Sequence, residues 1–237
     1  MELVNPWFEY INRSNKSTFH PNDEAHAMAF NSAMSKRKSF LLADYLEPFP
    51  YLGNPKAPVY VLLANPGKNS AEDKRTFKYS ARNLELIKQN LLHEGNQPFL
   101  FRLNSPENPN LESSYFKQRT AKLVSATSLE SVINNVFFIN FHAYHSKSWY
   151  AIPFTFYSQK YSFELVRSAV KRNALIIMSR NMTGWITAVP ELADYEHIFT
   201  FKSSRSVHLS EKNLGTDRKS TRLNSSHVSE SRMPSSA

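Results

Sequence analysis

The stretch "VYVLLANPG", residues 59–67, joins an apolar run to an abrupt turn. Its first five residues are apolar and rich in β-branched and aromatic side chains, which predicts a short buried strand. Pro66 has no N–H group with which to continue strand pairing, and Gly67 permits a tight turn. The strand therefore ends next to Asn65, and the sequence places a polar amide at its tip.

Three more runs share this character and predict further buried strands: "VFFIN" (136–140), "ALIIM" (174–178) and "HIFTF" (197–201). Amphipathic patterns lie between the runs, and they predict helices over 80–94, 113–135 and 158–173. Each of these patterns opens on a serine that can cap the first helical turn. In the first of them we expect Leu84, Ile87, Leu91 and Leu92 to form the buried stripe.

Strands that alternate with helices favour a parallel sheet covered on both faces. We therefore predict an α/β fold with three layers, in which a short, mostly parallel, four-stranded sheet is flanked by helices. Ligands bind such sheets in the crevice outside the carboxyl ends of the strands. The four segments that follow the strands are polar, and together they bring Asn, His, Ser, Arg and Lys to one rim. Ordinary polar loops are the alternative interpretation of these segments.

The last stretch, residues 217–237, resembles the translation of a sequencing adapter followed by an index and a primer ("DRKSTRLNSSH" and "SRMPSSA"). We expect it to be a non-native disordered tail, and the native chain to be cut near Thr216, which leaves one domain over 1–216. A serine-rich disordered tail of the protein itself is the alternative. The tail carries four basic and two acidic residues, so residues 1–216 keep +7 of the formal +9 charge.

Composition narrows the class of protein. The basic balance favours polyanionic partners. The chain has no cysteine, which excludes disulfides and thiolate metal sites. The N-terminus has no signal-peptide pattern, and no apolar run is long enough to span a bilayer. We expect a cytoplasmic monomer with DNA as its partner, with no membrane association, no cofactor and no metal.

At the motif level, "NPGKNSA" after the first strand and "VFFINFHAYHS" in the middle strand resemble the uracil-DNA glycosylase superfamily, in particular distant, uncharacterised bacterial members. The likeness covers roughly residues 45–215 in the order of elements. Asn65, Pro66, Gly67 and Asn140 match most closely. The resemblance implies an enzyme that flips a deaminated or modified base out of DNA and hydrolyses its N-glycosidic bond.

The resemblance also implies roles for individual residues. Asn65 would position the attacking water through its carbonyl oxygen, and an Asx turn is the alternative. Gly67 would let the backbone approach the flipped nucleotide. Phe77 or Tyr79 would stack on the base, although a core position is the commoner role for an aromatic residue. Asn140 offers a donor and an acceptor to the edge of uracil.

Two histidines follow Asn140 at a spacing of three, His142 and His145. No Asp or Glu stands at ligand spacing, so we interpret them as donors to substrate or backbone and not as a metal pair.

The last polar segment, "SSRSVHLSEKN", lacks the family's His-Pro-Ser. Arg205 or His208 would replace that histidine as the donor to the leaving base. Ser203 and Arg205 would contact DNA, as would Ser210, which we expect to cap a helix whose N-terminus holds a phosphate. The departure keeps two alternatives open: a catalytically silent DNA- or nucleotide-binding module of the same fold, and a nucleoside hydrolase.

Overall fold

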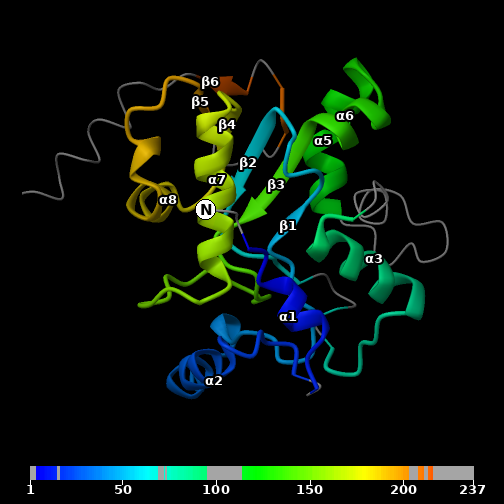
Figure 1. Ribbon diagram of the computed structural model, residues 1–237, viewed down its shortest axis with the longest axis vertical. Coiled ribbons are helices and arrows are strands. Elements are labelled where there is room, and N and C mark those ends of the chain that lie inside the picture. Colours follow the sequence, from blue (N-terminus) through cyan, green and yellow to red (C-terminus); the bar gives the residue numbers. More distant parts are fainter. Residues whose placement is uncertain are drawn as a thin grey trace, which may run out of the picture.

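The centre of the protein is a mixed six-stranded sheet with the strand order β1-β3-β2-β4-β5-β6 (Figure 1). The structure is a computed structural model, and it describes residues 4–14, 17–68, 72, 74–94, 114–202, 208–210 and 213–215. The strands are β1 (Tyr51–Leu52), β2 (Val59–Leu63), β3 (Val136–Asn140), β4 (Leu175–Met178), β5 (Ile198–Phe201) and β6 (Leu214–Gly215).

The four strands predicted from apolar runs form the parallel interior of the sheet, which confirms the α/β class. In the register of β2 and β3, Leu63 lies opposite Asn140, so both strands end at the same level. The predicted number of strands was wrong, because β1 and β6 add antiparallel edges beside β3 and β5. Each edge strand has only two residues, too few to produce a detectable period.

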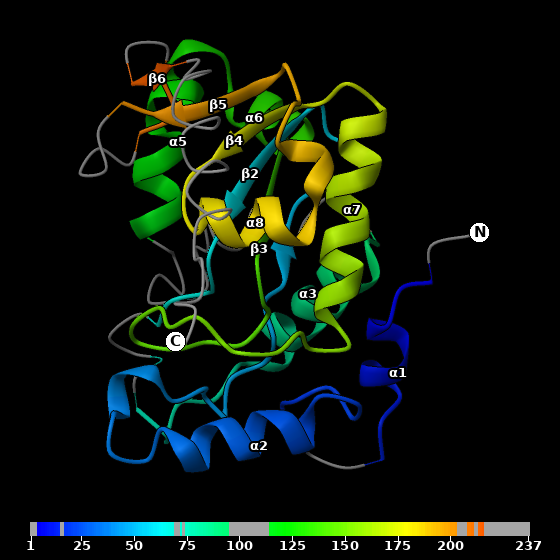
Figure 2. The ribbon, with the colours of Figure 1, turned by 90° about the vertical axis from the view of Figure 1, so that its left-hand side faces the viewer.

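Helices cover both faces of the sheet (Figures 1 and 2). Their bounds are α1 (Trp7–Ile11), α2 (Glu24–Ala33), α3 (Ala81–Leu92), α5 (Ser114–Ala126), α6 (Leu129–Asn135), α7 (Gln159–Lys171) and α8 (Met182–Ala188), with short 3-10 helices at Lys38–Phe40 and Pro190–Leu192. One face packs against α1, α3, α7 and α8 in the larger buried cluster. The other face packs against α5 and α6.

Serine side chains mark where two of the helices begin, because they accept hydrogen bonds from first-turn N–H groups that have no partner within the helix. Ser80 Oγ accepts from Asn83 N at 3.2 Å and begins α3. The predicted helix over 113–135 is two helices among the described residues, because Ser128 Oγ accepts from Ser131 N at 3.0 Å and starts α6. The expected cap at Ser158 was wrong, since its hydroxyl instead donates to the buried carboxylate of Asp23.

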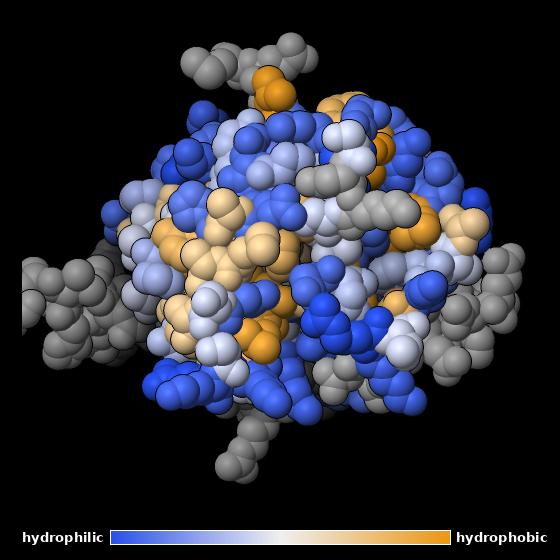
Figure 3. Space-filling view, turned by 90° about the horizontal axis from the view of Figure 1, so that it is seen from below, coloured by the Kyte–Doolittle hydropathy of each residue, from blue (hydrophilic) through white to orange (hydrophobic). Residues whose placement is uncertain are grey.

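Below the carboxyl ends of the strands lies a smaller unit built around α2 (Figure 2). Phe19, Ala27 and Phe30 form its satellite core with Tyr144 and Phe156 of the segment 141–158. That segment runs between the sheet and α2 in both ribbon views. The outer side of α2 remains apolar, with Met28 59% exposed, and Figure 3 shows apolar residues gathered on this face among hydrophilic ones.

Two sequence predictions concern other parts of the chain. No helix in the described part of the chain combines the length and the apolar character needed to cross a membrane. The predicted tail, 217–237, lies outside the described residues.

Candidate functional site

A cavity of about 450 Å³ opens where β2 and β3 end. This is the position at which a parallel α/β sheet places its ligand site, and the volume lies in the range of small-molecule pockets. Its lining comes from both strand ends, the 141–158 segment and the start of α5. The lining residues are Phe49, Leu63, Ala64, Asn65, Pro66, Gly67, Lys68, Glu72, Tyr115, Phe116, Asn140, His145, Lys147, Trp149 and Arg180.

Asn65 lines this cavity in a fixed orientation. Its Nδ2 donates to Ser146 Oγ at 2.8 Å and to the carbonyl oxygen of Pro66 at 3.1 Å. Both contacts use the nitrogen, and Oδ1 makes no hydrogen bond within the described part of the chain. An amide held in this way presents a hydrogen-bond acceptor to the cavity, as the placement of a water molecule requires.

Asn140 is 2% exposed and lines the same cavity. Its Nδ2 donates to the carbonyl oxygen of Phe49 at 2.8 Å, and its buried Oδ1 has no hydrogen-bond partner among the described residues. A buried polar atom without a partner is uncommon and costly. The sequence led us to expect a donor and an acceptor for the base, whereas the structure leaves only the acceptor available.

Backbone hydrogen bonds hold the segment after Asn140 in place. Ala43 N donates to the His145 carbonyl oxygen and Phe49 N to that of Ala143, both at 2.8 Å. Ser146 N donates to the Pro66 carbonyl oxygen at 3.3 Å. The N-terminal part of the chain and the Asn-Pro-Gly turn therefore fix the segment from two sides, which rigidifies the cavity wall.

The two histidines of this segment face different surroundings. His145 lines the cavity and its Nδ1–H donates to the Gly67 carbonyl oxygen at 2.7 Å, as a donor to backbone. His142 is buried and does not line the cavity; its ring stacks on Trp149 with centroids 5.4 Å apart. Burial, with a smaller effect from His145, lowers the pKa of His142 to about 3. His142 is therefore neutral at physiological pH.

Charged and aromatic side chains complete the lining. Glu72 is 2% exposed and is the one carboxylate among the described lining residues. Lys68, Lys147 and Arg180 supply positive charge. The aromatic residues are Phe49, Tyr115, Phe116 and Trp149. This composition suits an aromatic, hydrogen-bonding ligand with negative charge nearby.

The other predicted site residues lie elsewhere. Phe77 contacts Tyr79 edge to face, with centroids 4.9 Å apart, and packs against the main core. The ring of His208 turns to α5, where Nδ1 donates to the Gln118 carbonyl oxygen at 2.6 Å. Neither lines the cavity. Ser203 and Arg205 lie outside the described residues.

Ser210 precedes a turn, because Asn213 N and Leu214 N both donate to its carbonyl oxygen. The chain then enters strand β6, so the helix expected after Ser210 was wrong for the described residues 213–215. The buried Ser210 Oγ has no hydrogen-bond partner in the described part of the chain.

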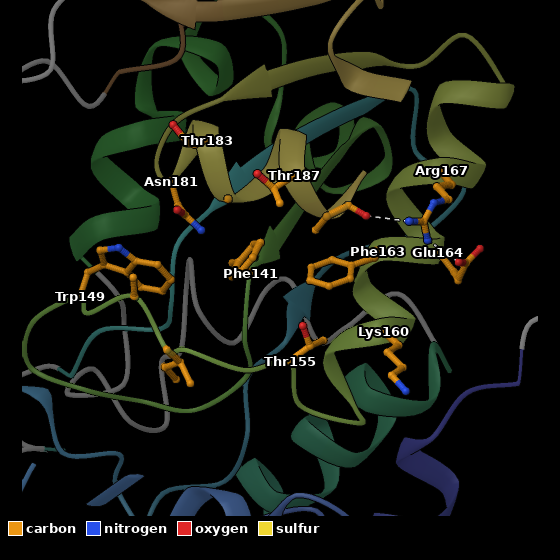
Figure 4. Close-up of a pocket in the computed structure, with 14 residues that line it drawn as sticks. Phe141, Trp149, Thr155, Lys160, Phe163, Glu164, Arg167, Asn181, Thr183 and Thr187 are labelled. Carbon is orange, nitrogen blue, oxygen red and sulfur yellow. Dashed lines mark hydrogen bonds and ion pairs between the residues drawn. The ribbon is translucent and has the colours of Figure 1, made fainter. Parts of the chain in front are cut away.

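A second cavity of about 760 Å³ lies between the 149–155 segment, α7 and α8 (Figure 4). Phe141, Phe163 and Trp149 give it an aromatic surface, and Trp149 lines both cavities. Two of its charged residues, Arg167 and Glu164, pair with each other, and Arg167 Nη2 also donates to the Ala188 carbonyl oxygen at 2.6 Å. The smaller cavity differs in its position at the ends of β2 and β3, where a parallel sheet places its ligand site.

Several lining residues were missed by the sequence reasoning. Lys147, Trp149 and Arg180 stand in the polar segments after β3 and β4, so their position after a strand was the available signal. Phe49, Tyr115 and Phe116 carry no such signal, since tertiary packing alone brings them to the cavity. Among the described residues, no group of three or more His, Cys, Asp or Glu side chains could hold a metal ion.

No family model, curated protein or solved structure matches this chain.

Proposed function

We propose that the chain is a uracil-DNA-glycosylase-like enzyme that hydrolyses the N-glycosidic bond of a deaminated or modified base in DNA. One observation carries the proposal: Asn65 and Asn140, from the ends of neighbouring parallel strands, line one aromatic cavity. In each amide the nitrogen donates to protein oxygens, which leaves the oxygen to accept a hydrogen bond from a ligand.

In this proposal the flipped base enters the cavity and donates a ring N–H to Asn140 Oδ1. Asn65 Oδ1 holds a water molecule beneath the sugar carbon. The water oxygen attacks that carbon, the carbon–nitrogen bond breaks, and its electron pair leaves with the base. An amide cannot take up the released proton, whereas the carboxylate of Glu72 in the same lining can.

The positive lining residues have a role in the same step. Negative charge develops on the departing base, and nearby cations stabilise it most strongly where water is excluded. Lys68, Lys147 and Arg180 all line the cavity, and His145 adds an imidazole. These residues take the role that the sequence predicted for Arg205 or His208.

The proposal is tested by base release. Oligonucleotides with uracil, hypoxanthine or a mismatched thymine, together with the corresponding free nucleosides, are incubated with the protein, and abasic sites are cleaved with alkali. We expect cleavage of at least one oligonucleotide and none above background with Asn65→Ala. Release from nucleosides alone indicates a nucleoside hydrolase instead.

The position of His208 favours one alternative, a DNA- or nucleotide-binding module without chemistry. Its ring donates to Gln118, away from the cavity, so no histidine of the last polar segment among the described residues faces a leaving base. This alternative predicts DNA affinity that falls as salt increases, with no base released from any substrate.

A further inference from the structure

Arg119 of α5 is a buried cation without a carboxylate partner in the described part of the chain. The residue is 2% exposed, and its guanidinium lies 4.3 Å from the Tyr115 ring centroid and 5.4 Å from that of Phe201. Its Nη1 donates to Ser179 Oγ at 3.0 Å. Its buried Nε has no hydrogen-bond partner among the described residues.

Such a residue needs compensation. Buried arginines are usually paired with a carboxylate, because removing a charge from water is costly. The two aromatic rings and one neutral hydroxyl offset only part of that cost. The unpartnered Nε shows where the compensation is incomplete.

A second cation stands next to this one. Arg180 follows Ser179 at the end of β4, is exposed, and lines the smaller cavity; no described carboxylate pairs with it. The pKa of Arg119 is lowered, mainly by burial. Tyr115 acts in the opposite direction, and the charge of Arg180 lowers the pKa further. The hydrogen bond from Arg119 to Ser179 places the first cation beside the residue that precedes Arg180.

Other groups at this point can bind an anion as well. The ring of Tyr115 lies 4.3 Å from the Arg119 guanidinium, and Tyr115 also lines the cavity, to which its hydroxyl adds a hydrogen-bonding group. Tyr115 and Arg180 line the cavity, and Arg119 adjoins them through its contacts with the Tyr115 ring and with Ser179, the residue before Arg180. Guanidinium groups recognise phosphate through paired N–H donors, which makes phosphate the anion that fits best.

We propose that Arg119 and Arg180, with Ser179 and Tyr115, form a binding site for a phosphate group at the edge of the Asn65–Asn140 cavity. On the proposed function, this phosphate belongs to the nucleotide whose base fills the cavity. Phosphate binding itself depends only on the arginine cluster.

The test measures thermal stability in sodium phosphate and in sodium chloride of equal ionic strength. We expect phosphate to raise the melting temperature of the full chain. Arg180→Gln should raise the phosphate concentration that gives half of this effect by about tenfold or more. Lys122→Gln is the matched control: it removes an exposed positive charge from α5, the helix of Arg119, and should keep the full phosphate response. In chloride, Arg119→Met melts no lower than the wild type because it removes an uncompensated buried charge.

Deoxyuridine and deoxyuridine 5′-monophosphate identify the source of the phosphate, and a short single-stranded oligonucleotide extends the comparison to the DNA backbone. If the site holds the phosphate of the bound nucleotide, deoxyuridine 5′-monophosphate should bind at least about tenfold more tightly than deoxyuridine. Arg180→Gln should remove this difference in affinity. A response to inorganic phosphate and oligonucleotide without that difference assigns the site to a neighbouring backbone phosphate. Base release is measured separately. A protein that releases no base but responds to phosphate therefore refutes only the proposed glycosylase activity.

Two results would overturn the site. One is an equal response to phosphate and chloride in the wild type. The other is a phosphate response that Arg180→Gln leaves unchanged. If Arg119→Met also melts several degrees lower in chloride, Arg119 serves only packing.

Discussion

The side-chain Nδ2 of Asn140 donates to the carbonyl oxygen of Phe49 at 2.8 Å, and this one bond decides which atom of the amide is left for a ligand. Phe49 precedes the edge strand β1, far from β3 in the sequence. The bond leaves Oδ1 buried and without a hydrogen-bond partner among the described residues. The cavity therefore selects ligands that donate a hydrogen bond at this point.

We expect the cavity to bind uracil more tightly than 3-methyluracil, because methylation removes the ring N–H that Asn140 Oδ1 would accept. A buried acceptor left without a donor costs about 1–3 kcal/mol, so the difference in Kd is about tenfold or more. Calorimetric titration of the two bases measures it. Asn140→Ala should bind both equally weakly; an undiminished preference in that variant would assign the discrimination to another residue.

Much of the fold was predictable because its signals are local. The four interior strands were predicted within one residue of their bounds, since buried parallel strands are continuous apolar runs. Local pattern was less reliable for α3: Leu84 is 43% exposed, and Leu86 occupies the buried stripe with Ile87 and Leu91. A leucine count cannot show which way a helix is rotated against its sheet.

The site was predictable only where it follows a strand. Asn65 and Asn140 stand at strand ends, so the topology of a parallel sheet was enough to bring them together. Phe77 and His208 were chosen by analogy with a motif, and neither lines the cavity. Arg119 gave no signal in the sequence, because a basic residue in the middle of an amphipathic helix is normally solvated.

The segment that forms the cavity wall depends on Asp23, a fully buried carboxylate. It accepts from the Tyr144 hydroxyl at 2.6 Å, from Tyr157 N at 2.5 Å and from the Ser158 hydroxyl. We expect Asp23→Ala to lower the free energy of unfolding by about 3–5 kcal/mol, because three donors lose a buried partner. Urea unfolding measures the change.

Asp44→Ala is the matched control for that experiment. Asp44 pairs with Arg75 at 2.9 Å on the surface, and exposed ion pairs contribute about 1 kcal/mol or less. Similar small losses in both variants would show that the Asp23 contacts do not hold the segment.

Acid should destabilise the protein through His142, which is buried, and His93, which is half-buried. Burial lowers the pKa of His93 to about 4 and that of His142 to about 3, whereas histidine in an unfolded chain titrates near 6.5. The unfolded chain therefore binds protons first, and the stability present above pH 6.5 is lost as the pH falls toward 4. Each histidine contributes a slope of about 1.4 kcal/mol per pH unit in that window.

Denaturant unfolding between pH 5 and 6.5 checks this prediction in the wild type and in His142→Gln. The variant should show a shallower decline, by about the slope of one histidine. His197→Gln, which replaces an exposed histidine, should decline like the wild type. An identical slope in all three proteins would contradict a neutral, buried His142.

The most direct test of the central claim is the single-turnover rate of base release from whichever oligonucleotide the wild type cleaves. Asn65→Ala removes the oxygen that would hold the water, while Asn54→Ala removes an exposed asparagine that caps its own turn. We predict a loss of about 100-fold or more for Asn65→Ala and an unchanged rate for Asn54→Ala. Equal rates in the two variants, or no base released by the wild type from any substrate, would contradict the account.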